Sequence, residues 1–290
     1  MTAIRLLAVP YEVGARGMGV GQGPERLLEA GAEEALGSRD ADVRLEVVEL
    51  RDHHRDESGA SEAGAGFELI RLVAERVKNA VDAGAFPVIL SGSCFAAVGV
   101  VTGIQEKSPG VVWFDAHGDF NAPESSADGY FDGMGVAILT GGAWQSMRAA
   151  IAGDPLPEGA VMLVGARAFD PGEEPRLESS TIRRLPPDAI DSGEAVARKT
   201  SELDPPPSGL YLHVDLDVLD RDEARVNIYS EPGGLSADQL EAQVRSLLDT
   251  RPVRAVSLTA YDPGVDAEGR VPPIALRLLE AVAVRVARDP

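Results

Sequence analysis

The chain is poor in several residue types, and each shortage excludes a class of protein. Its 290 residues include a single cysteine, Cys94, so an internal disulfide framework is excluded. No apolar run approaches the roughly 18 residues of a membrane span, and the N-terminal residues lack the layout of a signal peptide. From these shortages we expect a cytoplasmic protein that does not enter a membrane.

Basic residues are also scarce, with 27 Lys and Arg against 47 Asp and Glu, which gives a formal net charge of -20. Nucleic-acid binding needs basic patches, so no nucleic-acid partner is expected. An acidic chain suits cationic small molecules and divalent metals instead. Hydrophobic residues make up 44% and charged residues 26%, which is the composition of a globular protein.

Short apolar runs alternate with helical patterns along the chain. Strands are predicted at residues 4–9, 46–50, 86–90, 111–114, 161–164, 210–214 and 254–258. Helices are predicted at 67–81, 236–248 and 276–286, the second with a capping box formed by Ser236 and Gln239. Such alternation predicts an α/β fold with a parallel sheet between helices. No linker or repeat divides the chain, so we expect one domain over residues 1–290.

Two short strings follow buried strand candidates and carry most of the functional information. The first is Asp115-Ala-His117-Gly-Asp119, and the second is His213-Val-Asp215-Leu-Asp217. Because a strand alternates its side chains, we expect the acids and His117 to project on one side of each segment. Functional residues of parallel sheets lie at the carboxyl ends of strands, where both strings are predicted to lie.

Four carboxylates and an imidazole in one place repel or protonate unless a cation is present. The simplest partner is one or two divalent metals bound through oxygen and nitrogen. His213 lies on the same strand face as the acids, and a supporting role is favoured over direct ligation. The competing interpretation is that these acids are surface turn residues.

At this point the chain resembles the arginase superfamily of ureohydrolases, which includes arginase, agmatinase and formimidoylglutamase. The resemblance covers nearly the full length and rests on residues 19–27, 113–123, 164–173, 213–220 and 232–235. It implies a three-layer α/β/α fold around a parallel sheet, with two manganese ions. It also implies a homo-oligomer, a trimer or hexamer, that hydrolyses a C–N bond of a guanidino or amidino compound.

Carried over by position, the resemblance implies a role for each residue of the two strings. Asp115 and Asp215 would bridge the metals, Asp119 and Cys94 would complete one site, and the other site would be completed by His117 and Asp217. Hard oxygen ligands with little imidazole suit manganese. The candidate catalytic carboxylates are Asp119 and Asp132.

The chain departs from the family pattern at Cys94, which stands where the family has a histidine in Gly-Gly-Asp-His-Ser. A thiolate can ligate a divalent metal but prefers zinc over manganese. The alternative is a buried cysteine beside a site that lacks one ligand. The substitution resembles the N-hydroxyarginine amidinohydrolase of cycloserine biosynthesis, whose His-Gly-Asp-Phe-Asn string also matches His117 to Asn121 here.

Two further departures concern proton transfer and guanidinium binding. Asp132 stands before Gly133-Met134, where arginase carries a histidine. Ala260 occupies the position of a guanidinium-binding Glu, and either Asp262 or Glu231 could supply the missing carboxylate. Without a carboxylate there, a plain guanidinium loses a charge-assisted contact.

The remaining substrate-binding candidates differ in the ligand group that they favour. Asn121 matches the position that holds an amino-acid carboxylate in arginase, whereas Asp128 replaces a serine and would repel that carboxylate. Asp170 and Glu173 match the acids that receive the α-ammonium group. Together these residues favour a ligand with a positive end, although loop acids of this kind can also be a solvated rim.

The leading hypothesis is a dinuclear-metal hydrolase of a guanidino or amidino compound. The first alternative is hydrolysis of N-hydroxyarginine to hydroxyurea and ornithine. The second alternative is a binding protein that keeps the fold without the catalytic metals, which the departures at Cys94, Asp132 and Ala260 favour. The four clustered carboxylates argue against that second alternative.

Overall fold

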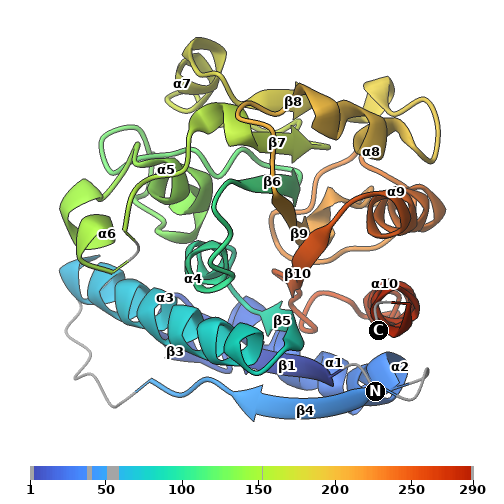
Figure 1. Ribbon diagram of the computed structural model, residues 1–290. Coiled ribbons are helices and arrows are strands. Elements are labelled where there is room, and N and C mark those ends of the chain that lie inside the picture. Colours follow the sequence, from blue (N-terminus) through green and yellow to red (C-terminus); the bar gives the residue numbers. More distant parts are fainter. Residues whose placement is uncertain (1–2, 38–40, 51–58, 152, 289–290) are drawn as a thin grey trace.

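The computed structural model describes residues 3–37, 41–50, 59–151 and 153–288, and a parallel sheet runs through the middle of this part of the chain (Figure 1). All pairs in the sheet are parallel. In spatial order its eight strands are β4 (Asp42–Val47), β1 (Ala3–Val9), β5 (Ala85–Ser91), β10 (Val253–Thr259), β9 (Gly209–Asp215), β6 (Pro109–Phe114), β7 (Val161–Val164) and β8 (Arg183–Leu185).

Helices cover both faces of the sheet, which Figure 1 shows nearly edge-on. One layer contains α3 (Gly59–Asp82), α4 (Ala96–Gly103), α5 (Gly135–Thr140) and α6 (Gln145–Ile151). The opposite layer contains α1 (Gly23–Glu29), α2 (Ala32–Gly37), α8 (Ala195–Lys199), α9 (Ala237–Thr250) and α10 (Val271–Ala287). The short α7 (Glu174–Ser179) lies near β7, and β2 (Tyr11–Glu12) pairs with β3 (Ala15–Arg16) in a small antiparallel hairpin. The predicted three-layer α/β/α fold is confirmed.

The central strands are apolar along their length because helices pack on both of their faces. Each face of the sheet has its own buried cluster, one built around Phe114 and Leu212 and the other around Trp113 and Tyr211. Every residue of β9 is buried, including the polar His213. The edge strand β4 is only half buried. The sheet is therefore most constrained in its middle, where the two acidic strings follow β6 and β9.

Most predicted elements lie within a few residues of the observed ones. The strand predicted at 46–50 was misplaced, because β4 begins at Asp42 and ends at Val47. The helix predicted from 276 begins at Val271, where two prolines occupy positions that tolerate them. The short β8 was not predicted, since three residues give no periodicity. Within the described residues, no helix is long and apolar enough to cross a membrane.

Candidate metal centre

The candidate site lies at the carboxyl ends of four adjacent strands, β5, β10, β9 and β6. Asp115 directly follows β6, Asp215 is the last residue of β9, and Ala260 directly follows β10. Cys94 lies three residues beyond the end of β5. All but Asp115 line a cavity of about 370 Å³. Strand order thus brings together residues that are up to 166 positions apart in the sequence.

The first acidic string is a loop, so the expected alternation of its side chains along a strand was wrong. β6 ends at Phe114, before the string begins. Asp115 is held by two donors, the Trp113 indole N–H on Oδ2 at 2.9 Å and the His117 backbone N–H on Oδ1 at 2.7 Å. Burial and the neighbouring Asp217 raise the pKa of Asp115, an effect that His117 opposes.

Asp119 turns toward the same cavity through an unusual backbone conformation. Its φ is +48°, in the left-handed region that Asp adopts more readily than most residues. Its carbonyl accepts hydrogen bonds from the N–H groups of Val136 and Ala137, where α5 begins. The side chain is 7% exposed, and its Oδ2 has no hydrogen-bond partner. Burial and then Asp115 raise the pKa of Asp119 well above its ordinary value.

The second string supplies Asp215 and Asp217, both buried. His117 of the first string contacts an acid of each string, with Nδ1 3.3 Å from Asp115 Oδ1 and 3.4 Å from Asp217 Oδ2. Burial alone would raise the pKa of Asp217, but His117 and a hydrogen bond from Asn227 lower it below its ordinary value. Burial and the charge of Asp217 raise the pKa of Asp215.

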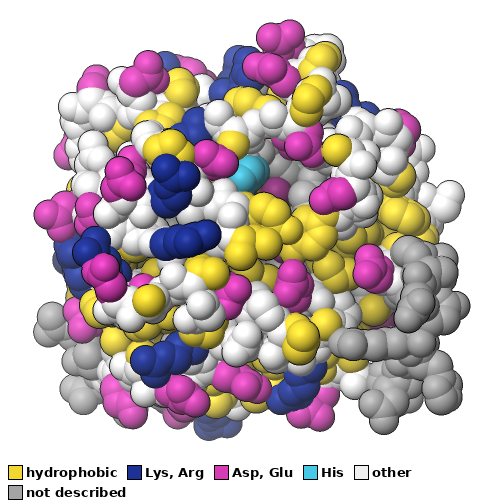
Figure 2. Space-filling model, turned by 180° about the vertical axis from the view of Figure 1, so that it is seen from behind, with side chains coloured by type: hydrophobic (Ala, Val, Ile, Leu, Met, Phe, Trp, Pro, Cys, Tyr) yellow, Lys and Arg dark blue, Asp and Glu magenta, His cyan; other side chains and the backbone are white. Residues whose placement is uncertain are grey.

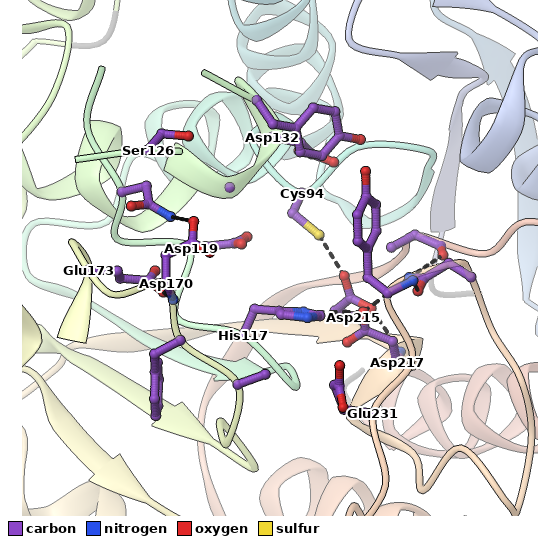
Figure 3. Close-up of a pocket in the computed structure, with 18 of the residues that line it drawn as sticks. Cys94, His117, Asp119, Ser126, Asp132, Asp170, Glu173, Asp215, Asp217 and Glu231 are labelled. Carbon is purple, nitrogen blue, oxygen red and sulfur yellow. Dashed lines mark hydrogen bonds and ion pairs between the residues drawn. The ribbon is translucent and has the colours of Figure 1, made fainter. Parts of the chain in front are cut away.

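Cys94 points into the same centre (Figure 3). Its thiol donates to Asp215 Oδ2 at 2.9 Å, and its sulfur lies 3.2 Å from Thr259 Oγ1. Burial and then Asp215 raise the pKa of this thiol. Because the sulfur contacts a carboxylate of the second string, Cys94 lies at the metal-site candidate and not in a separate apolar region.

His213 lies behind the centre. Its ring stacks on Trp113 at a centroid distance of 3.6 Å, Nδ1 is 3.0 Å from the Tyr211 hydroxyl, and Nε2 is 3.3 Å from Thr259 Oγ1. Burial lowers its pKa to about 3, so the ring is neutral at ordinary pH. Both nitrogens therefore have protein partners, as expected for a supporting residue.

The donor atoms fit divalent cations. Asp115, His117 and Asp217 offer ligand atoms within 4.8 Å of one another, and Asp115 also forms such a group with Cys94 and His213. Oxygen and imidazole donors suit manganese and similar ions, whereas the thiol is softer. The unpartnered, buried Asp119 Oδ2 is an independent indication that a positive group is bound here.

Asp132 forms part of the cavity wall beside Cys94. Its Oδ1 accepts the Phe95 backbone N–H at 3.0 Å, and the side chain is 7% exposed. Burial raises the pKa of Asp132 to about 7, a shift that hydrogen bonds from the Phe95 and Cys94 backbone partly offset. A carboxyl group with that pKa can both accept and donate a proton near neutrality.

Asp170 and Glu173, two predicted substrate-binding residues, lie together on the other side of the cavity from Cys94 (Figure 3), and a third, Asn121, also lines the cavity. The Asn121 amide donates to Asp170 Oδ2 at 2.9 Å. Glu173 accepts the Phe120 backbone N–H at 2.7 Å, and burial raises its pKa to about 7. Glu173 thus holds the loop that carries Asp119, whereas its ammonium-binding role stays a prediction.

Asp128, Glu231 and Ala260 also line the cavity. Asp128 Oδ1 accepts the Ser126 hydroxyl and the Tyr130 backbone N–H, at 3.2 and 2.9 Å. Ala260 is buried with φ +63°, a conformation that is strained for alanine. No side-chain carboxylate comes from position 260, and Glu231 reaches the cavity whereas Asp262 is not among its lining residues.

Two residues that sequence reasoning did not assign support the centre. Asn227 donates to Asp217 Oδ2 at 3.0 Å and to the Ala260 carbonyl at 3.1 Å. The Arg167 guanidinium donates to carbonyl oxygens of residues 165, 217, 218, 219, 231 and 232. A Cβ at Gly234 would lie 2.6 Å from Arg167 Nη2, so this loop needs glycine there. Arg167 follows β7 by three residues and Asn227 lies in the loop after Asp217, and their contacts form only in the folded chain, which is why no local pattern marks them.

Fold and site together define a three-layer α/β/α protein with a candidate metal centre at the carboxyl ends of its central strands. The model of the arginase family matches residues 2–284, and the chain belongs to this family. An arginase of Staphylococcus aureus (strain MSSA476) is 27% identical over 293 residues, which cover 96% of this chain and 95% of that one.

Solved structures agree with this assignment. The crystal structure of arginase from Bacillus cereus matches with a TM-score of 0.86 at 26% identity, over 97% of this chain and 98% of that one. Formimidoylglutamase from Bacillus subtilis subsp. subtilis str. 168 matches with a TM-score of 0.77 at 17% identity, over 100% of this chain and 88% of that one. The second match supports the fold alone. The first supports a hydrolase of the ureohydrolase type.

Proposed function

We propose that the protein hydrolyses a C–N bond of a guanidino or amidino compound, with two manganese ions bound at the site described above. One observation carries the proposal: both acidic strings converge on one buried cavity, where Asp119 Oδ2 has no partner. Carboxylates gathered so closely at low exposure need bound positive charge to remain ionised. Family membership supports the same chemistry.

The residues would divide between two cations as the resemblance implies. Asp115 and Asp215 would contact both, with Asp119 and Cys94 completing one site and His117 and Asp217 the other. When bound, such a pair of cations supplies the Lewis acidity that lets water react with a planar carbon at neutral pH. Trp113 and Asn227 fix the orientation of Asp115 and Asp217 through hydrogen bonds of 2.9 and 3.0 Å.

The other cavity residues would bind substrate and carry protons. Asp132 would hold a proton on its carboxyl oxygen and deliver it to the leaving nitrogen, because its pKa of about 7 suits both accepting and donating. Asp170 and Asp128 would present negative charge to the far end of the substrate, and Glu231 would supply the guanidinium-binding carboxylate that is missing at Ala260. Asn121 orients Asp170 through its amide N–H.

An N-hydroxylated guanidine is the second candidate substrate. The observation that favours it is Ala260, which leaves no carboxylate at the position where the family holds a plain guanidinium. An N-hydroxylated guanidine is less basic and depends less on such a carboxylate. We therefore expect it to react faster than free arginine.

The proposal is tested by measuring release of urea, hydroxyurea and ammonia from arginine, N-hydroxyarginine, agmatine, guanidinobutyrate and formimidoyl compounds with manganese added. We expect release from at least one of them, with arginine among the poor substrates. An Asp215→Ala variant serves as the blank. Absence of product from the whole series in a metal-loaded protein would favour the binding-protein alternative.

Assembly and location complete the proposal. We propose a homo-oligomer, a trimer or hexamer, on the resemblance alone, and sedimentation equilibrium measures it directly. A monomer in that experiment would contradict it. A cytoplasmic location, expected from the single cysteine, stays a prediction.

A further inference from the structure

Two tyrosine rings lie beside the cavity, close to the first acidic string. The ring centroids of Tyr130 and Tyr229 are 5.8 Å apart, and the Tyr229 ring stands edge-on to His117 at 6.4 Å. Both tyrosines line the cavity. Tyr229 is 42% exposed, and its neighbour Ile228 is 63% exposed. An aromatic ring in this position is accessible to a ligand that enters the cavity.

The surroundings of these rings are negative. The Tyr130 hydroxyl donates to Glu12 Oε1 at 3.4 Å, and its backbone N–H donates to Asp128 Oδ1 at 2.9 Å. Burial, assisted by nearby carboxylates, raises the pKa of Tyr229, so its hydroxyl stays protonated at neutral pH. Eight of the described residues that line the cavity are Asp or Glu, and none is Lys or Arg. Figure 2 shows histidine atoms at the bottom of a hollow with acidic side chains around it.

The cavity contains more carboxylate side chains than the metal centre is expected to use. Asp119, with its buried and unpartnered Oδ2, belongs to the floor of the cavity, where cations would neutralise it. Asp128 is not one of the residues expected to hold the metals, and its Oδ1 accepts the Tyr130 backbone N–H at 2.9 Å. Its carboxylate therefore lies beside an aromatic residue, and aromatic faces attract cations through the ring quadrupole. A carboxylate placed there would meet repulsion and no basic partner.

We propose that Tyr130, Tyr229 and Asp128 form a subsite that binds an alkylammonium group at the end of the substrate remote from the metals. This inference rests on the proposed function, because it takes the guanidino end to face the metal centre. The 6.4 Å between the Tyr229 ring and the His117 ring is a distance that a short alkyl chain bridges. The substrate class is therefore a guanidine or amidine with an ammonium tail and no carboxylate.

Calorimetric titration of the manganese-loaded protein with amines tests this, because amines are not hydrolysed. We expect n-butylamine, which is an alkylammonium ion at neutral pH, to bind at least about tenfold tighter than neutral 1-butanol, and ornithine, which carries a carboxylate, to bind more weakly than n-butylamine. Tyr229→Leu should weaken binding of n-butylamine by about threefold to thirtyfold and leave 1-butanol unchanged. Tyr229→Phe keeps the ring and should keep most of the preference.

Ile228→Ala is the matched control, since it changes an exposed neighbour that has no ring, and it should behave as wild type. Only variants whose melting temperature matches that of the wild type are compared. Equal binding of n-butylamine and 1-butanol, or a full preference for the amine retained by Tyr229→Leu, would overturn the subsite. Urea release with no preference for the amine overturns the subsite alone. A preference for the amine that depends on Tyr229, with no product from any guanidine, overturns the proposed function alone.

Discussion

At the scale of single residues, Asp119 shows how backbone and side chain cooperate at this centre. Its left-handed backbone lets the carbonyl accept two N–H groups at the start of α5, and the same turn directs the carboxylate into the cavity. A buried carboxylate without a hydrogen bond must either bind a proton or be compensated by a bound cation. Asp119 therefore contacts the start of α5 through its backbone carbonyl and faces the ligand cavity through its side chain.

Removing a shared carboxylate should remove the metals. We expect Asp215→Asn to lose bound manganese, because Asp215 is buried beside Cys94 and would contact both cations. Elemental analysis after gel filtration measures the metal content. Glu124→Gln is the control, since Glu124 lies on the loop after Asp119 but its side chain is 74% exposed. A full metal complement in Asp215→Asn would contradict the two-metal arrangement.

Cys94 should leave a spectroscopic signature. We expect the cobalt-loaded protein to show a near-ultraviolet sulfur-to-cobalt charge-transfer band, because a thiolate is a soft ligand that binds cobalt well. Cys94→Ser should lose the band, and Cys94→His should bind cobalt without it. Absorption spectra of the three proteins at equal cobalt content provide the measurement. Wild type that binds cobalt and lacks the band would rule out ligation by sulfur.

The residues of the centre differ in how far the sequence alone could reveal them. Asp115 and Asp215 follow apolar runs, so a local pattern predicts their place at strand ends. Asn227 and Arg167 act on Asp217 from loops, through an amide and through main-chain carbonyls. These contacts depend on tertiary structure, and no spacing in the sequence encodes them. The metal-binding and catalytic roles themselves stay predictions.

At the scale of elements, the site depends on where strands end. β5, β10, β9 and β6 are adjacent although the chain visits them in a different order, so four loops converge at one edge. Periodicity predicted the strands but not their neighbours, because pairing is a long-range property. The alternation expected for the first string failed because β6 ends at Phe114, and the buried residues that follow form a loop.

The α9 helix tests a purely local prediction. Ser236 Oγ accepts the Gln239 N–H at 3.2 Å, and Gln239 Oε1 accepts the Ser236 N–H at 2.9 Å, which confirms the capping box. We expect Ser236→Ala to lower the free energy of unfolding by about 1 kcal/mol. Urea denaturation measures the change. Ser236→Asp keeps a capping oxygen and should restore most of the stability, and equal losses in both variants would contradict the cap.

At the scale of the whole molecule, the buried acids couple stability to pH. Burial raises the pKa of Asp119 and Asp215 well above ordinary values, and that of Asp132 and Glu173 to about 7. A group with a raised folded-state pKa contributes stability at low pH that is lost as pH rises through that value. His213, whose pKa is lowered, is neutral in both states above its ordinary value of 6.5.

The metal-free protein should therefore melt at lower temperature as pH rises from about 6.5 to about 8. Added manganese should raise the melting temperature more at the higher pH, since the ligands must be deprotonated to bind it. Calorimetry with a chelator and with manganese at both pH values measures the effect. A metal-free melting temperature that increases over this interval would contradict the raised pKa values.

The fold class followed from the sequence because alternating strands and helices have few arrangements, and a parallel sheet covered on both faces is the usual one. The net charge of -20 favours a cationic ligand, which stays a prediction. The sequence did not predict the tyrosines beside the cavity, because Tyr130 and Tyr229 are 99 positions apart and meet only in the folded chain. The expectation of one domain over residues 1–290 stays a prediction.

The hydrogen bonds from Arg167 to main-chain carbonyls affect which loop residues can be substituted during evolution. One side chain fastens the main chain on both sides of the loop between Asp217 and Glu231, without relying on the side chains in between. Ile228 and Tyr229 lie within that loop and are exposed. Residues 228 and 229 can therefore be substituted during evolution while Asp217 keeps its position. The ligand preference of the cavity can then change without loss of this candidate metal ligand.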